Sequence, residues 1–183
     1  RRTHDAIEAI HSSINKSPKY VLDGDIRKCF DQINHDALLA KLDTFPHMRR
    51  QINAWLKAKI VMQDEILFSD RGTPQGGILS PLLANIALNG IEEYLSDWIA
   101  EIPAFSPGGH RISKPNRRKR LLYVRYADDF VVLHPDKKVI DSVKVLIEKY
   151  ISPMGLELHP EKTFITDTYI KIGDQNPGFK FLG

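Results

Sequence analysis

The sequence predicts an α+β domain in which an antiparallel sheet is backed by helices. Three observations predict this class: a strand-like segment at 19–26, an apolar hairpin pattern at 121–133, and helical spacing of apolar residues in several segments between and after them. With 183 residues and 42% hydrophobic content, the chain is long enough to bury one core.

The first half of the chain contains predicted helices on both sides of one predicted strand. Residues 3–16 place apolar side chains four apart, as one face of a helix does, and a Ser-Pro pair ends that helix. Residues 19–26 form the predicted strand, which ends in acidic residues. Asn34 is placed to cap a helix over 35–42, and a further helix follows Pro46.

The middle of the chain carries the clearest helix start. Ser80 suits an N-cap and Pro81 suits the first helical position, and the apolar spacing then predicts one long helix over 82–99. The proline- and glycine-rich segment 103–116 is predicted as a loop.

The last third is predicted to return to strands. Residues 121–133 are apolar except around Asp128 and Asp129, which predicts a tight hairpin with the acidic pair at its tip. Asp136 is placed to cap a helix with apolar residues on one side. Short strands are expected at 156–159, 164–166 and 169–172.

Composition excludes several classes of protein. A single cysteine, Cys29, excludes an internal disulfide framework and suggests a small buried side chain, and no Cys-His spacing predicts a zinc site. The seven histidines show no metal-ligand spacing and are interpreted as structural or surface residues. No apolar run approaches the roughly 20 residues that span a bilayer, so we expect a soluble chain with no membrane partner. The single cysteine fits a reducing compartment such as the cytoplasm.

Basic residues gather in one segment, although the net charge is only +3. A basic run attracts polyanions such as nucleic acid, yet an isolated run is more often a solvated loop. The acidic hairpin that follows favours the nucleic-acid interpretation. The candidate nucleic-acid-binding residues are Arg111, Lys114, Arg117, Arg118, Lys119 and Arg120.

Two distant acidic motifs are the candidate chemical centre. Asp25 ends the predicted strand, and Asp128 and Asp129 occupy the hairpin tip. An acidic pair in a turn is usually a solvated turn, but apolar flanking residues such as Phe130 fix this one on a packed hairpin. Carboxylates held together repel and usually share a cation, and magnesium prefers such hard oxygen ligands. Phosphoryl transfer by two ions needs carboxylates that bridge them.

A glycine-rich segment lies between the acidic motifs in the sequence. Gly76 and Gly77 let a backbone approach a ligand closely, and Gln75 offers both a donor and an acceptor. In isolation this would be an ordinary glycine turn before a helix.

These motifs together resemble those of reverse transcriptases. Residues 24–31 (GDIRKCFD) resemble the first catalytic motif, Gln75 to Pro81 resembles QGxxxSP, and Tyr126 to Asp129 resembles the YxDD box. Residues 155–163 and 178–183 are similar to the next block and to the start of the primer grip. The motif sequences YADD and QGGILSP look most like those of bacterial group II intron enzymes.

The resemblance implies roles for individual residues. Asp25 and Asp128 would bind two magnesium ions, for which manganese could substitute, with the carbonyl of Ile26 as a further ligand and Asp129 as a weaker one. The remaining implied roles are a 2′-hydroxyl block for Phe30, the nucleotide pocket for Gln75 and Gly76, and protonation of pyrophosphate for Lys162. The plain alternatives are a core aromatic for Phe30 and a surface lysine for Lys162.

The resemblance also implies a domain organisation and partners. Residues 1–19 and 33–79 would belong to the fingers of a right-hand polymerase, and 20–32 and 80–183 to its palm, with the thumb and upstream fingers absent. We therefore expect the isolated fragment to lack processive synthesis. The partners would be an RNA template, a DNA primer, deoxynucleotides and intron RNA. Two alternatives stay open, an RNA-binding intron maturase and a host-defence relative.

Overall fold

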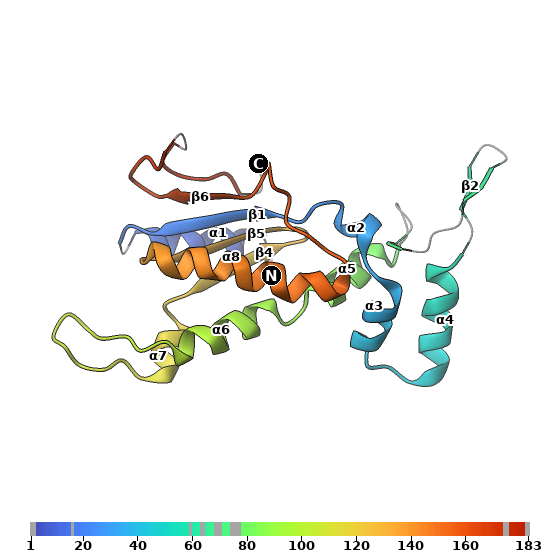
Figure 1. Ribbon diagram of the computed structural model, residues 1–183, viewed down its shortest axis with the longest axis horizontal. Coiled ribbons are helices and arrows are strands. Elements are labelled where there is room, and N and C mark those ends of the chain that lie inside the picture. Colours follow the sequence, from blue (N-terminus) through green and yellow to red (C-terminus); the bar gives the residue numbers. More distant parts are fainter. Residues whose placement is uncertain are drawn as a thin grey trace. The chain divides into compact units, whose positions relative to one another are not determined.

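The computed structural model describes residues 3–15, 17–58, 60–62, 65–67, 71–73, 78–173 and 176–181. The chain forms two compact units (Figure 1). The first, here the sheet unit, comprises Arg1–Asp25, Gly90–Ile147 and Leu158–Gly183. The second, here the helix-rich unit, comprises Ile26–Asn89 and Glu148–Glu157.

A four-stranded antiparallel sheet in the order β4-β5-β1-β6 forms the centre of the sheet unit. This sheet and its helices confirm the predicted α+β class. The predicted strand and acidic hairpin are confirmed as β1, β4 and β5. The strands are β1 (Tyr20–Asp25), β4 (Leu122–Tyr126), β5 (Asp129–His134) and β6 (Phe164–Asp167), and the helices α1 (Thr3–Ile14), α6 (Ile91–Glu101), α7 (Lys114–Arg118) and the first part of α8 (Lys137–Ile151).

The core of the sheet unit joins α1 to one face of the sheet. Ala6 and Ile10 of α1 pack with Val21, Val124 and Val131 of three neighbouring strands, and all five are buried. The four-residue spacing of Ala6 and Ile10 is the apolar stripe that the sequence predicts. The α1 helix therefore covers part of the face that carries Val21, and Asp23 and Asp25 project from that same face because they follow Val21 at two-residue steps.

The helix-rich unit holds short helices tied together by side-chain hydrogen bonds. Asn34 caps α3 by accepting a hydrogen bond from the Ala37 N–H at 2.9 Å, as predicted. Lys41 Nζ donates to the Ala87 carbonyl at 2.8 Å and satisfies the end of α5. The elements are α2 (Cys29–Gln32), α3 (His35–Lys41), α4 (Pro46–Leu56), β2 (Ile60–Met62), β3 (Glu65–Leu67), α5 (Ser80–Leu88), the last turn of α8 and a 3-10 turn (Ser152–Met154).

The long helix predicted over 82–99 is wrong. Two helices, α5 and α6, replace it, because Gly90 adopts a left-handed φ of 89° and breaks the hydrogen-bond ladder. The apolar spacing continues across the break, so periodicity alone could not locate it. The helix also starts one residue early, with Leu79 rather than Ser80 at the N-cap.

Other local expectations also need correction. The loop predicted over 103–116 ends earlier, since α7 begins at Lys114 with Pro115 in its first turn, where proline is favoured. No strand forms at 156–159 or 169–172, whereas the strand predicted at 164–166 is confirmed as β6. Cys29 is buried, as predicted, and none of the described helices is long and apolar enough to cross a bilayer.

Gly24 holds the strand that ends at Asp25 in close contact with its neighbour. It pairs with Phe130 across β1 and β5, and a Cβ atom built on Gly24 would collide with the Phe130 ring. Phe130 is fully buried and stacks on Tyr123 with ring centroids 5.9 Å apart. The ring therefore fills the space that glycine leaves, and any side chain at position 24 must displace it.

We expect Gly24→Ala to destabilise the protein by about 1 to 3 kcal/mol, because the added methyl overpacks a closed core. Denaturant unfolding measures this change. Gly24→Ala combined with Phe130→Leu should recover part of the loss, since the smaller side chain makes room. Gly108→Ala, in an open loop where the new Cβ has ordinary contacts, is the matched control and should change stability by less than about 0.5 kcal/mol. Equal losses in both alanine variants would contradict the steric argument.

Candidate active site

The acidic motifs that lie far apart in the sequence meet at one end of the sheet. Asp25 is the last residue of β1 and pairs directly with Asp129, the first residue of β5. Asp23 lies two residues earlier on β1 and so projects to the same face as Asp25. Cross-strand partners share a face, which places Asp23, Asp25 and Asp129 together.

Asp128 lies in the two-residue turn that joins β4 to β5. The preceding residue, Ala127, has a φ of 55°, a left-handed conformation that non-glycine residues adopt at a cost. Arg125 Nη1 donates to the Ala127 carbonyl at 2.7 Å and holds this turn. The turn geometry fixes Asp128 next to Asp129 at the edge of the site.

Burial and neighbouring like charges disfavour ionisation of two carboxyls at this site, those of Asp129 and Asp23. Burial, together with the charges of Asp128 and Asp25, raises the pKa of Asp129, and Lys162 opposes the rise. Burial and then the charges of Asp129 and Asp25 raise the pKa of Asp23 to about 6, although the Lys180 backbone N–H donates to it. These carboxyls are therefore close enough to act on one another.

A lysine from the far end of the chain contacts the central carboxylate. Lys162 Nζ lies 2.8 Å from Asp25 Oδ2, and the Asp25 side chain is only 17% exposed. The bond to Asp25 is the main cause that raises the pKa of Lys162, so the amine stays protonated. The His159 N–H donates to the Asp25 carbonyl at 2.8 Å, which anchors the segment carrying Lys162 to the end of β1.

The donor set suits a divalent cation. Asp25, Asp128 and Asp129 offer hard carboxylate oxygens, and their mutual repulsion is what a bound cation relieves. The ammonium of Lys162 is the positive partner of Asp25 in the structure. Within the described part of the chain, no three ligating side chains converge into a group that could hold a metal ion. The fit of these residues to such an ion therefore rests on their carboxylate chemistry and on their shared end of the sheet.

Other predicted site residues lie outside this cluster or outside the described residues. Ile26 and Phe30 belong to the helix-rich unit, whereas the carboxylates belong to the sheet unit. Gln75 and Gly76 lie outside the described residues, so their predicted roles stay predictions.

Phe30 lies beside the start of the glycine-rich segment. Its carbonyl accepts from the Thr73 N–H at 2.6 Å, and the Gly72 N–H donates to the Ile33 carbonyl at 2.8 Å. A Cβ at Gly72 would lie 2.6 Å from the Phe30 carbonyl oxygen, so glycine is needed for this approach. The Phe30 ring is half-buried and is not part of the buried core.

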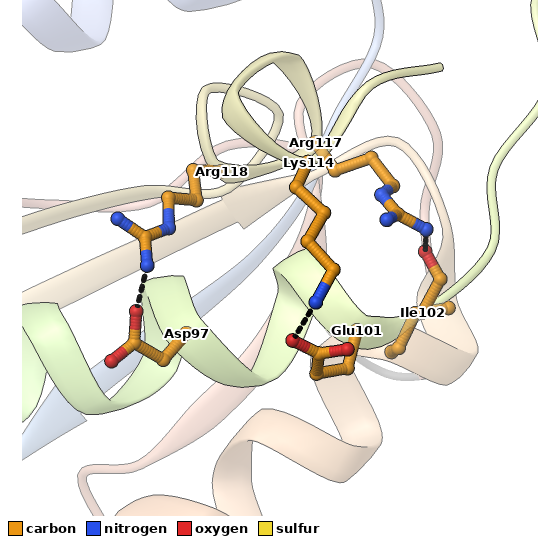
Figure 2. Close-up of polar contacts among 6 residues, drawn as sticks. All are labelled: Asp97, Glu101, Ile102, Lys114, Arg117 and Arg118. Carbon is orange, nitrogen blue, oxygen red and sulfur yellow. Dashed lines mark hydrogen bonds and ion pairs between the residues drawn. The ribbon is translucent and has the colours of Figure 1, made fainter. Parts of the chain in front are cut away.

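Half of the predicted basic segment is engaged within the protein. Figure 2 shows three side chains of α7 reaching toward α6 and its end. Lys114 Nζ contacts Glu101 at 2.6 Å, Arg118 forms an ion pair with Asp97, and the buried Arg117 donates to the Ile102 carbonyl at 2.9 Å. Arg111, Lys119 and Arg120 do not take part in these contacts.

Asp23 is the member of the site that sequence reasoning missed. The signal was present, since acidic residues two apart on a strand share one face, and Asp23 precedes Asp25 at that spacing. The contact between Lys162 and Asp25 had no such local signal, because only the tertiary fold brings the two together.

Comparisons with known proteins assign a family to this arrangement. The family model described as reverse transcriptase (RNA-dependent DNA polymerase) matches residues 1–183. The group II intron-encoded protein LtrA of Lactococcus lactis subsp. cremoris is 29% identical over 213 residues, covering 91% of this chain and 35% of LtrA. Protein YkfC of Escherichia coli is 27% identical over 210 residues, covering 100% of this chain and 52% of YkfC.

Further relatives extend beyond bacteria. An uncharacterised 91 kDa protein in the cob intron of Schizosaccharomyces pombe is 27% identical and covers 92% of this chain and 26% of its own length. Among solved structures, telomerase from Candida tropicalis, in complex with a fragment of telomeric RNA, matches with a TM-score of 0.72 at 15% identity, covering 100% of this chain and 32% of that one. That likeness supports the fold. The chain spans about half or less of the length of these relatives.

Proposed function

Since the chain belongs to the reverse transcriptase family, we propose that it forms the catalytic part of an RNA-directed DNA polymerase of the group II intron type. The observation that carries the proposal is the pairing of Asp25 with Asp129 beside the Asp128 turn. The reaction would add a deoxynucleotide to the 3′ end of a DNA primer on an RNA template. The 3′ hydroxyl would attack the α-phosphorus, and pyrophosphate would leave.

In this proposal, Asp25 and Asp128 would hold the catalytic metal ions, with Asp129 and the Ile26 carbonyl as auxiliary ligands. Two magnesium ions, when bound, would lower the pKa of the attacking hydroxyl and neutralise the leaving pyrophosphate, and manganese would substitute. The carboxylates orient the reacting groups because they are fixed on a packed strand end and a two-residue turn.

Lys162 is proposed as the proton donor to pyrophosphate. Its contact with Asp25 and its raised pKa support a protonated amine at the site. In the absence of substrate the same amine offsets the negative charge on Asp25.

Phe30, Gln75 and Gly76 are proposed to shape the nucleotide pocket. The hydrogen bond between Phe30 and Thr73 supports this, because it ties Phe30 to the segment that leads into Gln75. Phe30 would exclude a 2′-hydroxyl by its volume.

The broader assignments belong to the same proposal. Residues 20–32 and 80–183 would form the palm, and 1–19 and 33–79 part of the fingers. The partners would be an RNA template, a DNA primer, deoxynucleotides and intron RNA, in a bacterial cytoplasm or a ribonucleoprotein. An intron maturase that binds RNA is the second candidate, which similarity to a group II intron-encoded protein favours.

We expect Asp25→Asn and Asp128→Asn each to abolish magnesium-dependent primer extension in the full-length protein, because each removes a metal ligand without adding bulk. RNA binding should persist in both variants. Asp141→Asn is the matched control, since Asp141 pairs with Lys137 on the exposed face of α8 and its substitution should leave extension unchanged. Extension within about tenfold of wild type in either site variant would contradict the proposal, which assigns several kcal/mol to the metal site.

Phe30→Ala should raise the incorporation of ribonucleotides relative to deoxyribonucleotides by roughly 5- to 150-fold, because burying an unpaired hydroxyl against the ring costs about 1 to 3 kcal/mol. Competition assays with both substrates measure the ratio, and a thermal melt accompanies them. Phe45→Ala, at an aromatic residue that is 60% exposed, is the control and should change neither value. A large stability loss with an unchanged substrate ratio would make Phe30 a core residue.

A further inference from the structure

A basic hollow lies at the end of the sheet opposite to the carboxylates. It is a cavity of about 330 Å³, and its polar lining consists of Ser12, Ser13, Lys19, Lys119 and Arg120. Lys19 directly precedes β1, whose other end is Asp25, while Lys119 and Arg120 precede β4. The length of β1 separates the hollow from the carboxylates by about 20 Å, at roughly 3.3 Å per residue.

All the charged residues among the described lining residues are positive. Three cationic side chains and two hydroxyls face the cavity, and none of the described residues that line it is acidic. Within the described residues, neither Lys119 nor Arg120 forms an ion pair. Lys19 Nζ donates to Ser17 Oγ at 2.6 Å.

The rest of the basic segment does not share this environment. Lys114 and Arg118 pair with acidic residues of α6, and Arg117 is buried against its end (Figure 2). The basic segment therefore has two parts. The residues of α7 contact α6 and its end, whereas Lys119 and Arg120, which follow, line the hollow together with Lys19.

The positive charges of the hollow affect a neighbouring histidine, His134. Burial, followed by the positive charges of Arg120 and Lys19, lowers the pKa of His134 to about 4, against the opposing effect of Asp136. His134 therefore stays neutral at pH 7 and adds no charge of its own.

A plainer explanation is that these cations only satisfy helix C-termini. Ser12 and Ser13 lie in the last turn of α1, and Lys119 is the C-cap of α7. Each helix end carries at most about half a negative charge, and the five-residue α7 less than that. Lys119 and Arg120 alone carry two positive charges, and two such helix ends offset at most about one of them, so the hollow keeps an excess of positive charge.

We propose that Lys19, Lys119 and Arg120, with the hydroxyls of Ser12 and Ser13, form a binding site for a backbone phosphate of single-stranded RNA. Hydroxyls and cations together are the donors that phosphate oxygens accept from. The choice of RNA as the source of the phosphate rests on the proposed function. The distance from the carboxylates makes this a site that holds the strand away from the reacting groups.

The test compares two double variants that remove the same charge from the same segment. Fluorescence anisotropy of a labelled single-stranded RNA, in EDTA and over a series of NaCl concentrations, measures affinity of the full-length protein. Lys119→Gln with Arg120→Gln should weaken binding about tenfold near 0.1 M salt and reduce the salt slope by about 1.4, or about 0.7 per contact. Lys114→Gln with Arg118→Gln should change affinity less than about twofold, because exposed ion pairs contribute little.

Two further measurements distinguish loss of charge from loss of folding, and RNA from a free anion as the ligand. The charge-retaining swap Lys119→Arg with Arg120→Lys should bind RNA within about threefold of wild type, which separates lost charge from lost folding. Calorimetry with inorganic phosphate tests a free anion as ligand, and millimolar or tighter binding that disappears in Lys119→Gln with Arg120→Gln would overturn the assignment to RNA. Equal weakening by both double variants, or an unchanged slope in the first, would also overturn it. If RNA binding follows the expected pattern but wild-type protein does not extend a primer, the phosphate site stands and the proposed polymerase function is wrong.

Discussion

The antiparallel register between β1 and β5 is the constraint on which the rest of this site depends. It pairs Asp25 with Asp129, and it does so only while Gly24 stays opposite Phe130. Because side chains alternate along a strand, a slip of one residue would turn Asp25 away from its partners and into the other face. The fit of the Phe130 ring over Gly24 opposes that slip, since any other residue placed there would collide with the ring. The packing of Phe130 on Gly24 at one face of the sheet therefore keeps Asp25 beside Asp129 at the other face.

The site works against folding. Burial, followed by repulsion from neighbouring carboxylates, raises the pKa values of Asp23 and Asp129. The left-handed Ala127 adds local strain at the turn. The contact of Lys162 with Asp25 offsets part of the repulsion between the carboxylates. Burial of the valines and leucines of the sheet stabilises the fold against the rest. Such an arrangement is expected where a cation or substrate completes the structure.

The sequence predicted those parts of the molecule whose signals are local. Apolar stretches on both sides of an acidic pair predicted the β4–β5 hairpin, and the Asn34 cap predicted the start of α3. The break at Gly90 was missed because the apolar spacing runs through it, and the start of α7 was missed because Pro115 suits both a loop and a first helical turn. Asp23 had a usable period-two signal. By contrast, the hydrogen bond of Arg117 to the Ile102 carbonyl and the ion pair of Arg118 with Asp97 depend on α6 and its end, which only tertiary structure brings alongside.

We propose that two segments distant in sequence, around Asp25 and around Asp128, share one metal site. Localised backbone cleavage by Fe²⁺, substituted for Mg²⁺ in the presence of ascorbate and peroxide, tests it most directly, because the radicals cut the chain next to the bound ion. We expect cuts near Asp25 and near Asp128 in the same molecules, both suppressed by excess Mg²⁺ and both lost in Asp128→Asn. Cleavage at only one of the two segments, or cuts near Asp25 that persist in Asp128→Asn, would contradict it.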